Sequence, residues 1–127
     1  MKYVFDTSVI IDSLRSSIGV RGVLGKFDGT DDELYVSSIV GFELFSGDSA
    51  KEPEKVGEIL KYLKYFEVVE LTWVIARRAG DIYRNGVRGL QIPDYVIAAT
   101  ALELGAEIVT LNRKHFEKVP GVRVFAL

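Results

Sequence analysis

The sequence contains no cysteine and only one histidine, His115. Disulfides, thiolate zinc centres and iron–sulfur clusters are therefore excluded. A metal site built on several histidines is excluded as well, and so is a serine–histidine triad that does not use His115. No uninterrupted apolar run approaches the ~20 residues of a membrane-spanning helix, and the N-terminus enters a strand-like run without a signal-peptide pattern. We therefore expect a soluble protein of the cytoplasm.

The chain also lacks a strong net charge and the composition of a disordered protein. Its formal charge is −2, which gives no global attraction to nucleic acid, so any such contact needs a local basic patch or a metal ion. With 127 residues, 48% of them hydrophobic, and only three prolines, the chain is typical of one folded domain. We expect residues 1–127 to form that single domain.

Three acidic residues, Asp6, Glu43 and Asp94, stand alone in apolar segments. Each is the only charge of its segment, in YVFDTSVII, LYVSSIVGFELFSG and GLQIPDYVIAATAL respectively. An ionised carboxylate that leaves water costs several kcal/mol unless it is paired or bound to metal. If the fold brings the three together, their repulsion requires a cation. The pattern therefore predicts a site of three oxygen ligands for a divalent ion, Mg²⁺ or Mn²⁺.

Short strand-like runs alternate with helical patterns, which is typical of an α/β fold with parallel strands. The expected strands are Lys2–Phe5, Glu33–Val36, Glu67–Leu71, Glu107–Leu111 and Val122–Phe125. The expected helices run from the Asp6-Thr7-Ser8 cap to Leu14, from the Ser37-Ser38 cap to Phe45, and over Glu54–Phe66, Thr72–Arg88 and Pro93–Leu104. Four glycines interrupt a further helical pattern over Arg15–Gly29.

The acids fall where such a sheet collects its functional groups. Asp6 directly follows the first strand, Asp94 lies in the first turn of its helix, and Glu43 lies one or two turns after the second strand. Asn112 follows a late strand. Because sites gather at the carboxyl ends of parallel strands, we expect these four side chains to converge on one edge of the sheet.

Four tracts in this order, VFDTSVIID, ELFSG, IPDYVIAATALELGAEIVTLNRKHF and VPGVRV, resemble the PIN-domain family. Within that family they are most similar to the VapC-type toxins of toxin–antitoxin pairs, and the match runs from Lys2 to Phe125. The resemblance implies a three-layer α/β/α sandwich around a mainly parallel sheet of about five strands. It also implies a metal-dependent endoribonuclease that hydrolyses phosphodiester bonds in RNA.

By this resemblance Asp6, Glu43 and Asp94 match the three acids that hold the metal. Glu43 could ligate it directly or act as base toward the attacking water. Asn112 falls where the family has a fourth Asp or Asn, after the Thr of its T-x-[ND] motif, and is therefore a further candidate catalytic residue. His115 stands where many relatives carry Asp, and its role is left open.

Each candidate also has a local interpretation. Asp6 could simply cap a helix, Asp94 could interact with a helix dipole, and Glu43 could pair with a basic residue such as Arg78. Two further sets of residues have both a functional and a local interpretation. The first set could support the metal ligands or simply cap helices and strand ends. The second set could guide RNA phosphates or form a solvated, salt-bridged face. These sets are Thr7, Ser8 and Thr110, and Arg77, Arg84 and Arg88 on one predicted helix face.

Other functions fit parts of the pattern. One alternative is a PIN nuclease for RNA processing or decay without an antitoxin. Another is a non-catalytic module, such as a degenerate RNA-binding platform or an Mg²⁺-binding phosphoacceptor receiver domain. A receiver domain usually has paired acids after its first strand and an Asp after a central strand, whereas this sequence has Asp6-Thr7 and Glu70-Leu71-Thr72 there.

The VapC resemblance further implies a homodimer and a VapB-type antitoxin with a basic side chain near the acids. The apolar residues that could receive it, or simply pack together, are Phe42, Leu44, Phe45, Val56, Ile59, Leu60 and Leu63.

Overall fold

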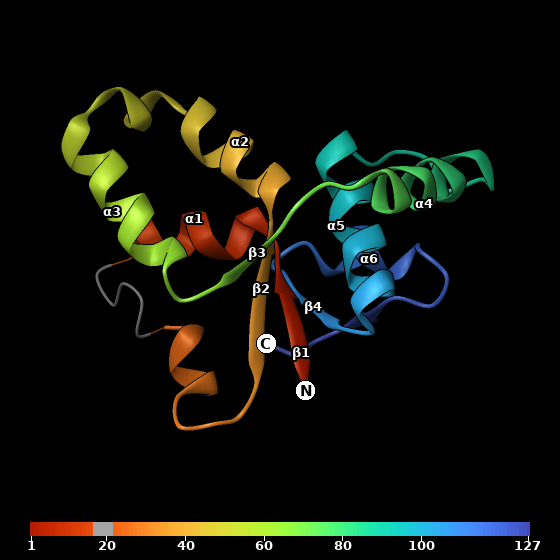
Figure 1. The fold of residues 1–127 in the computed structure, drawn as a ribbon, viewed down its shortest axis with the longest axis horizontal. Coiled ribbons are helices and arrows are strands. Elements are labelled where there is room, and N and C mark those ends of the chain that lie inside the picture. The colour runs from red at the N-terminus through yellow and green to blue at the C-terminus, as the bar shows by residue number, and fades with distance from the viewer. Residues whose placement is uncertain (17–21) are drawn as a thin grey trace.

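The computed structural model describes residues 1–16 and 22–127, so the uncertain pattern over Arg15–Gly29 lies partly outside the described residues. Its strands form one sheet in the order β3-β2-β1-β4-β5, and every neighbouring pair is parallel (Figure 1). The strands are β1 (Lys2–Phe5), β2 (Glu33–Ser37), β3 (Glu67–Val69), β4 (Glu107–Val109) and β5 (Arg123–Val124). The predicted parallel sheet is confirmed.

Helices cover both faces of this sheet. They are α1 (Thr7–Arg15), α2 (Ser38–Ser46), α3 (Pro53–Leu63), α4 (Trp73–Arg84), α5 (Ile92–Leu104) and α6 (Arg113–Glu117), with short 3₁₀ turns η2 (Leu24–Phe27) and η3 (Asp48–Lys51). Figure 1 shows α1 and α3 on one side of the strands and α4, α5 and α6 on the other. The predicted three-layer α/β/α arrangement is therefore confirmed.

The predicted helix Thr72–Arg88 is too long. α4 ends at Arg84, and Gly86 adopts a φ of 110°, which other residues rarely adopt. The amide of Val87 then donates to the Ile82 carbonyl oxygen at 3.3 Å and closes the end of the helix. Arg88 consequently lies outside α4 and does not share a helix face with Arg77 and Arg84.

Several smaller boundaries also differ from the prediction. β3 ends at Val69, and beyond it the amide of Leu71 donates to Ser38 Oγ at 3.1 Å rather than to a neighbouring strand. The helix expected to reach Phe66 ends at Leu63, and β4 and β5 are shorter than predicted. α6 was not predicted, because five residues are too few to establish a helical period.

The core forms on both faces of the central strand β1. Tyr3 and Phe5 point to the same face, since side chains alternate along a strand, and both contact Phe27 of η2. Phe5 also packs on Phe66. The opposite face is covered by α5, which is buried without interruption from Tyr95 to Ala101 between the sheet and α4. This burial on all sides explains why the α5 sequence is apolar around its whole circumference.

The strand order creates a switch point beside β1. From β1 the chain proceeds outward to β2 and β3, and only later returns to place β4 on the other side of β1. The Asp6 amide donates to the Val109 carbonyl oxygen at 2.9 Å, so the ends of β1 and β4 meet. Connections diverge at such a point and leave a crevice at the carboxyl ends of the strands, which is where α/β proteins bind ligands. Asp6 lies at this position.

No helix among the described residues is long and apolar enough to cross a membrane.

Candidate active site

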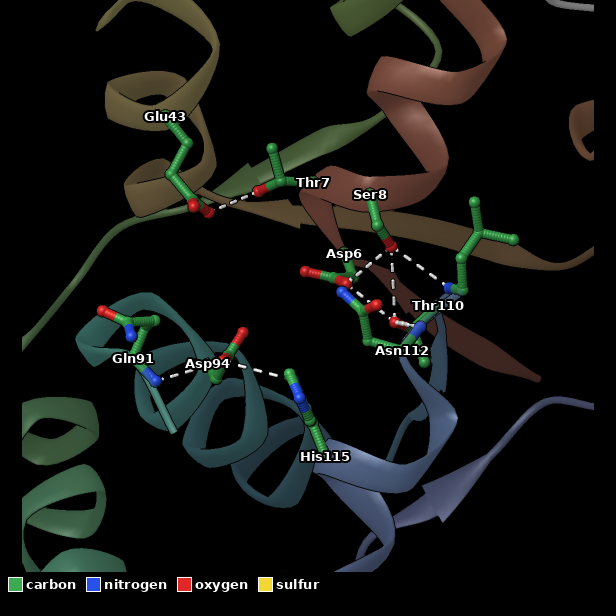
Figure 2. Close-up of polar contacts among 10 residues, drawn as sticks. Asp6, Thr7, Ser8, Glu43, Gln91, Asp94, Thr110, Asn112 and His115 are labelled. Atoms are coloured by element: carbon green, nitrogen blue, oxygen red, sulfur yellow. Dashed lines mark hydrogen bonds and ion pairs between the residues drawn. The ribbon is translucent and has the colours of Figure 1, made fainter. Parts of the chain in front are cut away.

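Asp6 begins the site at the end of β1. Its side chain is only 3% exposed, and it occupies the N-cap position of α1 without making a side-chain capping bond. Its Oδ2 instead accepts hydrogen bonds from Ser8 Oγ at 2.8 Å and Thr110 Oγ1 at 2.7 Å. The simple capping interpretation of Asp6 is therefore wrong. Ser8 and Thr110 fix one carboxylate oxygen, and Figure 2 shows the other directed toward the space between Glu43 and Asp94.

Glu43 reaches the same space from α2. Its Oε1 accepts a hydrogen bond from Thr7 Oγ1 at 2.5 Å, across 36 positions of sequence. Thr7 is buried in the first turn of α1, so this bond ties the glutamate to the helix that follows Asp6. The alternative pairing with Arg78 is wrong, because Arg78 pairs with Glu103 at 2.8 Å.

Asp94 approaches from the opposite side, in the first turn of α5. Its Oδ2 accepts from the Gln91 amide at 3.2 Å, and Gln91 and Asp94 form a reciprocal capping box. Asp94 therefore caps the start of α5 through Oδ2, and this bond leaves its second carboxylate oxygen uncommitted. His115 Nδ1 of α6 lies 3.8 Å from Asp94 Oδ2. Figure 2 shows the three carboxyl groups arriving from α2, the end of β1 and α5 around one common space.

The negative charges of the acids affect the pKa values of Glu43 and Asp94. Burial raises the pKa of Glu43; the Thr7 hydrogen bond opposes this rise, and the charges of Asp6 and Asp94 add to it. Burial also raises the pKa of Asp94, and the charge of Asp6 adds to this rise. The hydrogen bond from the Gln91 amide and the charge of His115 oppose it. Among the described residues, no lysine or arginine forms an ion pair with any of the three acids. The negative charge is therefore uncompensated by a strong cation of the protein itself.

The chemistry of this donor set fits a hard divalent cation. Carboxylate oxygens are the ligands that Mg²⁺ and Mn²⁺ prefer, and a few suffice because Mg²⁺ keeps several waters. The described residues include no ready-made group of three His, Cys, Asp or Glu side chains that could hold an ion as it stands. The carboxylates of Asp6, Glu43 and Asp94 are each held by neighbouring hydrogen bonds, so these side chains must rotate to close around an ion.

Asn112 lies at the same edge but is less engaged. It is the N-cap residue of α6 without a side-chain capping bond, and its amide donates to Thr110 Oγ1 at 2.9 Å. Its backbone therefore supports the threonine that fixes Asp6. The side chain is exposed, and its catalytic role stays a prediction.

The three arginines predicted to guide RNA do not form one stripe. Arg84 pairs with Asp81 at 2.8 Å, which agrees with the alternative of a solvated, salt-bridged face. The Arg88 guanidinium lies 3.9 Å from the centre of the Tyr83 ring. Arg77 is exposed on α4. A role of these residues in RNA binding stays a prediction.

Sequence reasoning missed one neighbour of Asp94, the residue Gln91. Gln91 precedes Asp94 by three positions, the spacing of a capping box, and this signal could have identified it. His115, which the resemblance singled out with its role left open, is brought beside Asp94 by the position of α6.

The fold and this constellation of acids define a class of protein. Residues 3–122 match the family model described as PIN domain, and the chain belongs to that family. Within it, the chain belongs with the VapC ribonucleases. It is 36% identical over 116 residues to Ribonuclease VapC10 of Mycobacterium tuberculosis, covering 87% of this chain and 83% of that protein. It is 32% identical over 129 residues to Ribonuclease VapC1 of Methanocaldococcus jannaschii, covering 98% and 87%.

Solved structures agree on the fold. A chain in the crystal structure of VapBC2 from Rickettsia felis bound to a DNA fragment from its promoter superposes with a TM-score of 0.83. The alignment covers 98% of each chain at 20% sequence identity, so it carries the fold alone.

Proposed function

We propose that this protein is a metal-dependent endoribonuclease of the VapC type, the toxin of a toxin–antitoxin pair, acting on RNA in the cytoplasm. The observation that carries the proposal is the meeting of Asp6, Glu43 and Asp94 at the switch point of a PIN-domain sheet, without a lysine or arginine paired to them. The relatives named above as ribonucleases support the reaction.

Each acid has a distinct part in this proposal. A bound Mg²⁺ or Mn²⁺ supplies charge stabilisation for the scissile phosphate and lowers the pKa of a bound water. Asp6 and Asp94 would hold the ion, with Ser8 and Thr110 orienting Asp6 through its Oδ2. Glu43 would either complete the ligands or take a proton from the attacking water, a role that its raised pKa suits.

The reaction is tested with purified protein and single-stranded or looped RNA. Cleavage is expected in millimolar Mg²⁺ or Mn²⁺, complete loss in excess EDTA, and recovery when the ion is restored, because the carboxylates alone stabilise no phosphate charge. Gel or mass-spectrometric analysis of the products measures it. Cleavage that persists in excess EDTA would contradict a metal-dependent mechanism.

A groove beside Glu43 suits a partner segment. α1, α2 and α3 enclose a cavity of about 190 Å³ that Glu43 lines together with the apolar residues Ile11, Leu14, Leu44 and Ile59. An extended segment of an antitoxin could bury apolar side chains there and place a basic side chain beside the acids. Solved neighbours include DNA-bound VapBC from Salmonella typhimurium and a toxin-antitoxin complex from Klebsiella pneumoniae. We propose that a VapB-type antitoxin occupies this groove and suppresses cleavage.

Leu60 was predicted among the docking residues, but it is 51% exposed and does not line the groove. This difference supplies a matched pair of variants. Ser49→Trp fills the groove from an exposed lining position, so it is expected to weaken the antitoxin complex at least about tenfold, whereas Leu60→Glu leaves affinity nearly unchanged. Calorimetry with the co-expressed adjacent-gene product measures both.

Equal affinity of both variants would place the antitoxin elsewhere. Failure of any neighbouring-gene product to bind or inhibit would instead leave a PIN nuclease without an antitoxin. The homodimer also stays a proposal; large apolar side chains that are exposed in the single chain, among them Phe42, Trp73 and Ile92, are candidates for its interface. Light scattering on the same samples measures the oligomeric state.

A further inference from the structure

His115 is the only histidine of the chain, and the fold brings it to the proposed metal site from an element of its own. It lies on α6, which Phe116 anchors by complete burial in the core. Figure 2 shows the imidazole directed toward Asp94 across the gap between α6 and α5. The His115 side chain is 47% exposed, so its second ring nitrogen can hydrogen-bond to water.

The separation of the two side chains is informative. His115 Nδ1 lies 3.8 Å from Asp94 Oδ2, which is too far for a hydrogen bond of ordinary length. For metal–ligand bonds of about 2.1 Å, two ligand atoms at right angles lie about 3.0 Å apart and two opposite ones about 4.2 Å apart. The observed distance falls between these values, so one ion could contact both atoms after a rotation of the side chains.

A backbone hydrogen bond holds the Asp94 carboxylate in place. The Gln91 amide occupies one acceptor direction of Oδ2 at 3.2 Å and fixes the carboxylate at the start of α5. A carboxylate oxygen can accept more than one contact, and Oδ2 is also the Asp94 oxygen that lies 3.8 Å from His115 Nδ1. Asp94 is therefore held by the start of α5 rather than by His115.

We propose that His115 Nδ1 is a metal ligand together with Asp94, and that it makes the site prefer Mn²⁺ or Co²⁺ over Mg²⁺. This inference rests on the proposed function, since it concerns the same metal site. Imidazole nitrogen binds transition ions far better than it binds Mg²⁺, for which oxygen ligands and water are preferred. A site of carboxylates alone discriminates much less between these ions, since carboxylate oxygens suit both Mg²⁺ and Mn²⁺. His115 thus sets which ion the nuclease uses.

The test uses tag-free protein, so that His115 remains the only imidazole. Pulsed electron paramagnetic resonance of bound Mn²⁺ is expected to show imidazole ¹⁴N coupling in the wild type and none in His115→Ala. By calorimetry, the ratio of Mn²⁺ to Mg²⁺ affinity is expected to fall at least about tenfold in His115→Ala, since even indirect supporting residues change affinity by 10–100-fold. Lys114→Ala, an exposed neighbour on α6, is the matched control and should keep both the coupling and the ratio.

The outcomes separate the two proposals. The role of His115 would be overturned if the wild type binds Mn²⁺ without ¹⁴N coupling and His115→Ala keeps the same ratio of Mn²⁺ to Mg²⁺ affinity. The metal site would then remain, and the histidine would be only a charge partner of Asp94. Absence of Mn²⁺ and Mg²⁺ binding in the wild type would overturn the metal site itself, and the role of His115 with it. Circular dichroism confirms that both variants are folded.

Discussion

Replacing Asp6 or Asp94 by asparagine is expected to reduce RNA cleavage to background, a loss of at least roughly 10²-fold in the rate of the chemical step. Each substitution keeps the shape of the side chain and removes the charge that would hold the ion. RNA binding should survive, because neither acid attracts phosphate. Single-turnover cleavage and RNA binding by anisotropy measure the two effects separately.

Asp12→Asn is the matched control for Asp6→Asn. Asp12 lies on the same helix, α1, but is exposed to solvent, so its variant should retain full activity. If the Asp6 and Asp94 variants cleave RNA as fast as the control, the proposed active site is wrong. If the Asp6 and Asp94 variants lose RNA binding while Asp12→Asn keeps it, the two acids act on substrate binding rather than on the reaction.

Divalent metal is expected to stabilise the folded protein strongly. An ion that binds only the folded state at 100 times its Kd adds about 2.7 kcal/mol, which raises Tm by several degrees in a domain of this size. The shift should be much smaller in Asp6→Asn. The metal-free variant should be as stable as the wild type or more so, because it has lost the repulsion that Asp6 exerts on Glu43 and Asp94. Differential scanning calorimetry with and without Mn²⁺ tests both statements.

Mild acidification should partly replace the metal. Burial raises the pKa of Glu43 and of Asp94 in the folded protein, so the folded state binds more protons than the unfolded state between the ordinary pKa and the raised one. Stability falls as pH rises through that window and is recovered as pH is lowered through it. The Tm of metal-free protein should therefore rise on going from neutral pH toward the ordinary carboxyl range, and saturating metal should reduce this dependence. A metal-free Tm that falls steadily as the pH is lowered over the same range would contradict the raised pKa values of Glu43 and Asp94.

The local pattern of the sequence was enough to predict much of the fold. Alternating strand-like and helical runs predicted the strands and the five longer helices, since side-chain periods and caps depend on near neighbours. The isolation of Asp6, Glu43 and Asp94 in apolar segments indicated a shared site, because each segment had to enter a core. Local signals failed where they were short or ambiguous, as for the five-residue α6 and for the end of α4 at Arg84 rather than Arg88.

The sequence by itself therefore determined which acids would be placed in apolar surroundings and at which ends of which elements. The tertiary structure alone decided what each acid contacts. The bonds of Thr110 to Asp6, across 104 positions, and of Thr7 to Glu43, across 36, join segments whose proximity depends on the order of strands in the sheet. The approach of His115 to Asp94 likewise depends on how α6 docks beside α5. Periodicity specifies which face of an element is buried, but the pairing of distant elements follows from packing the whole core at once, and no short stretch of sequence records it.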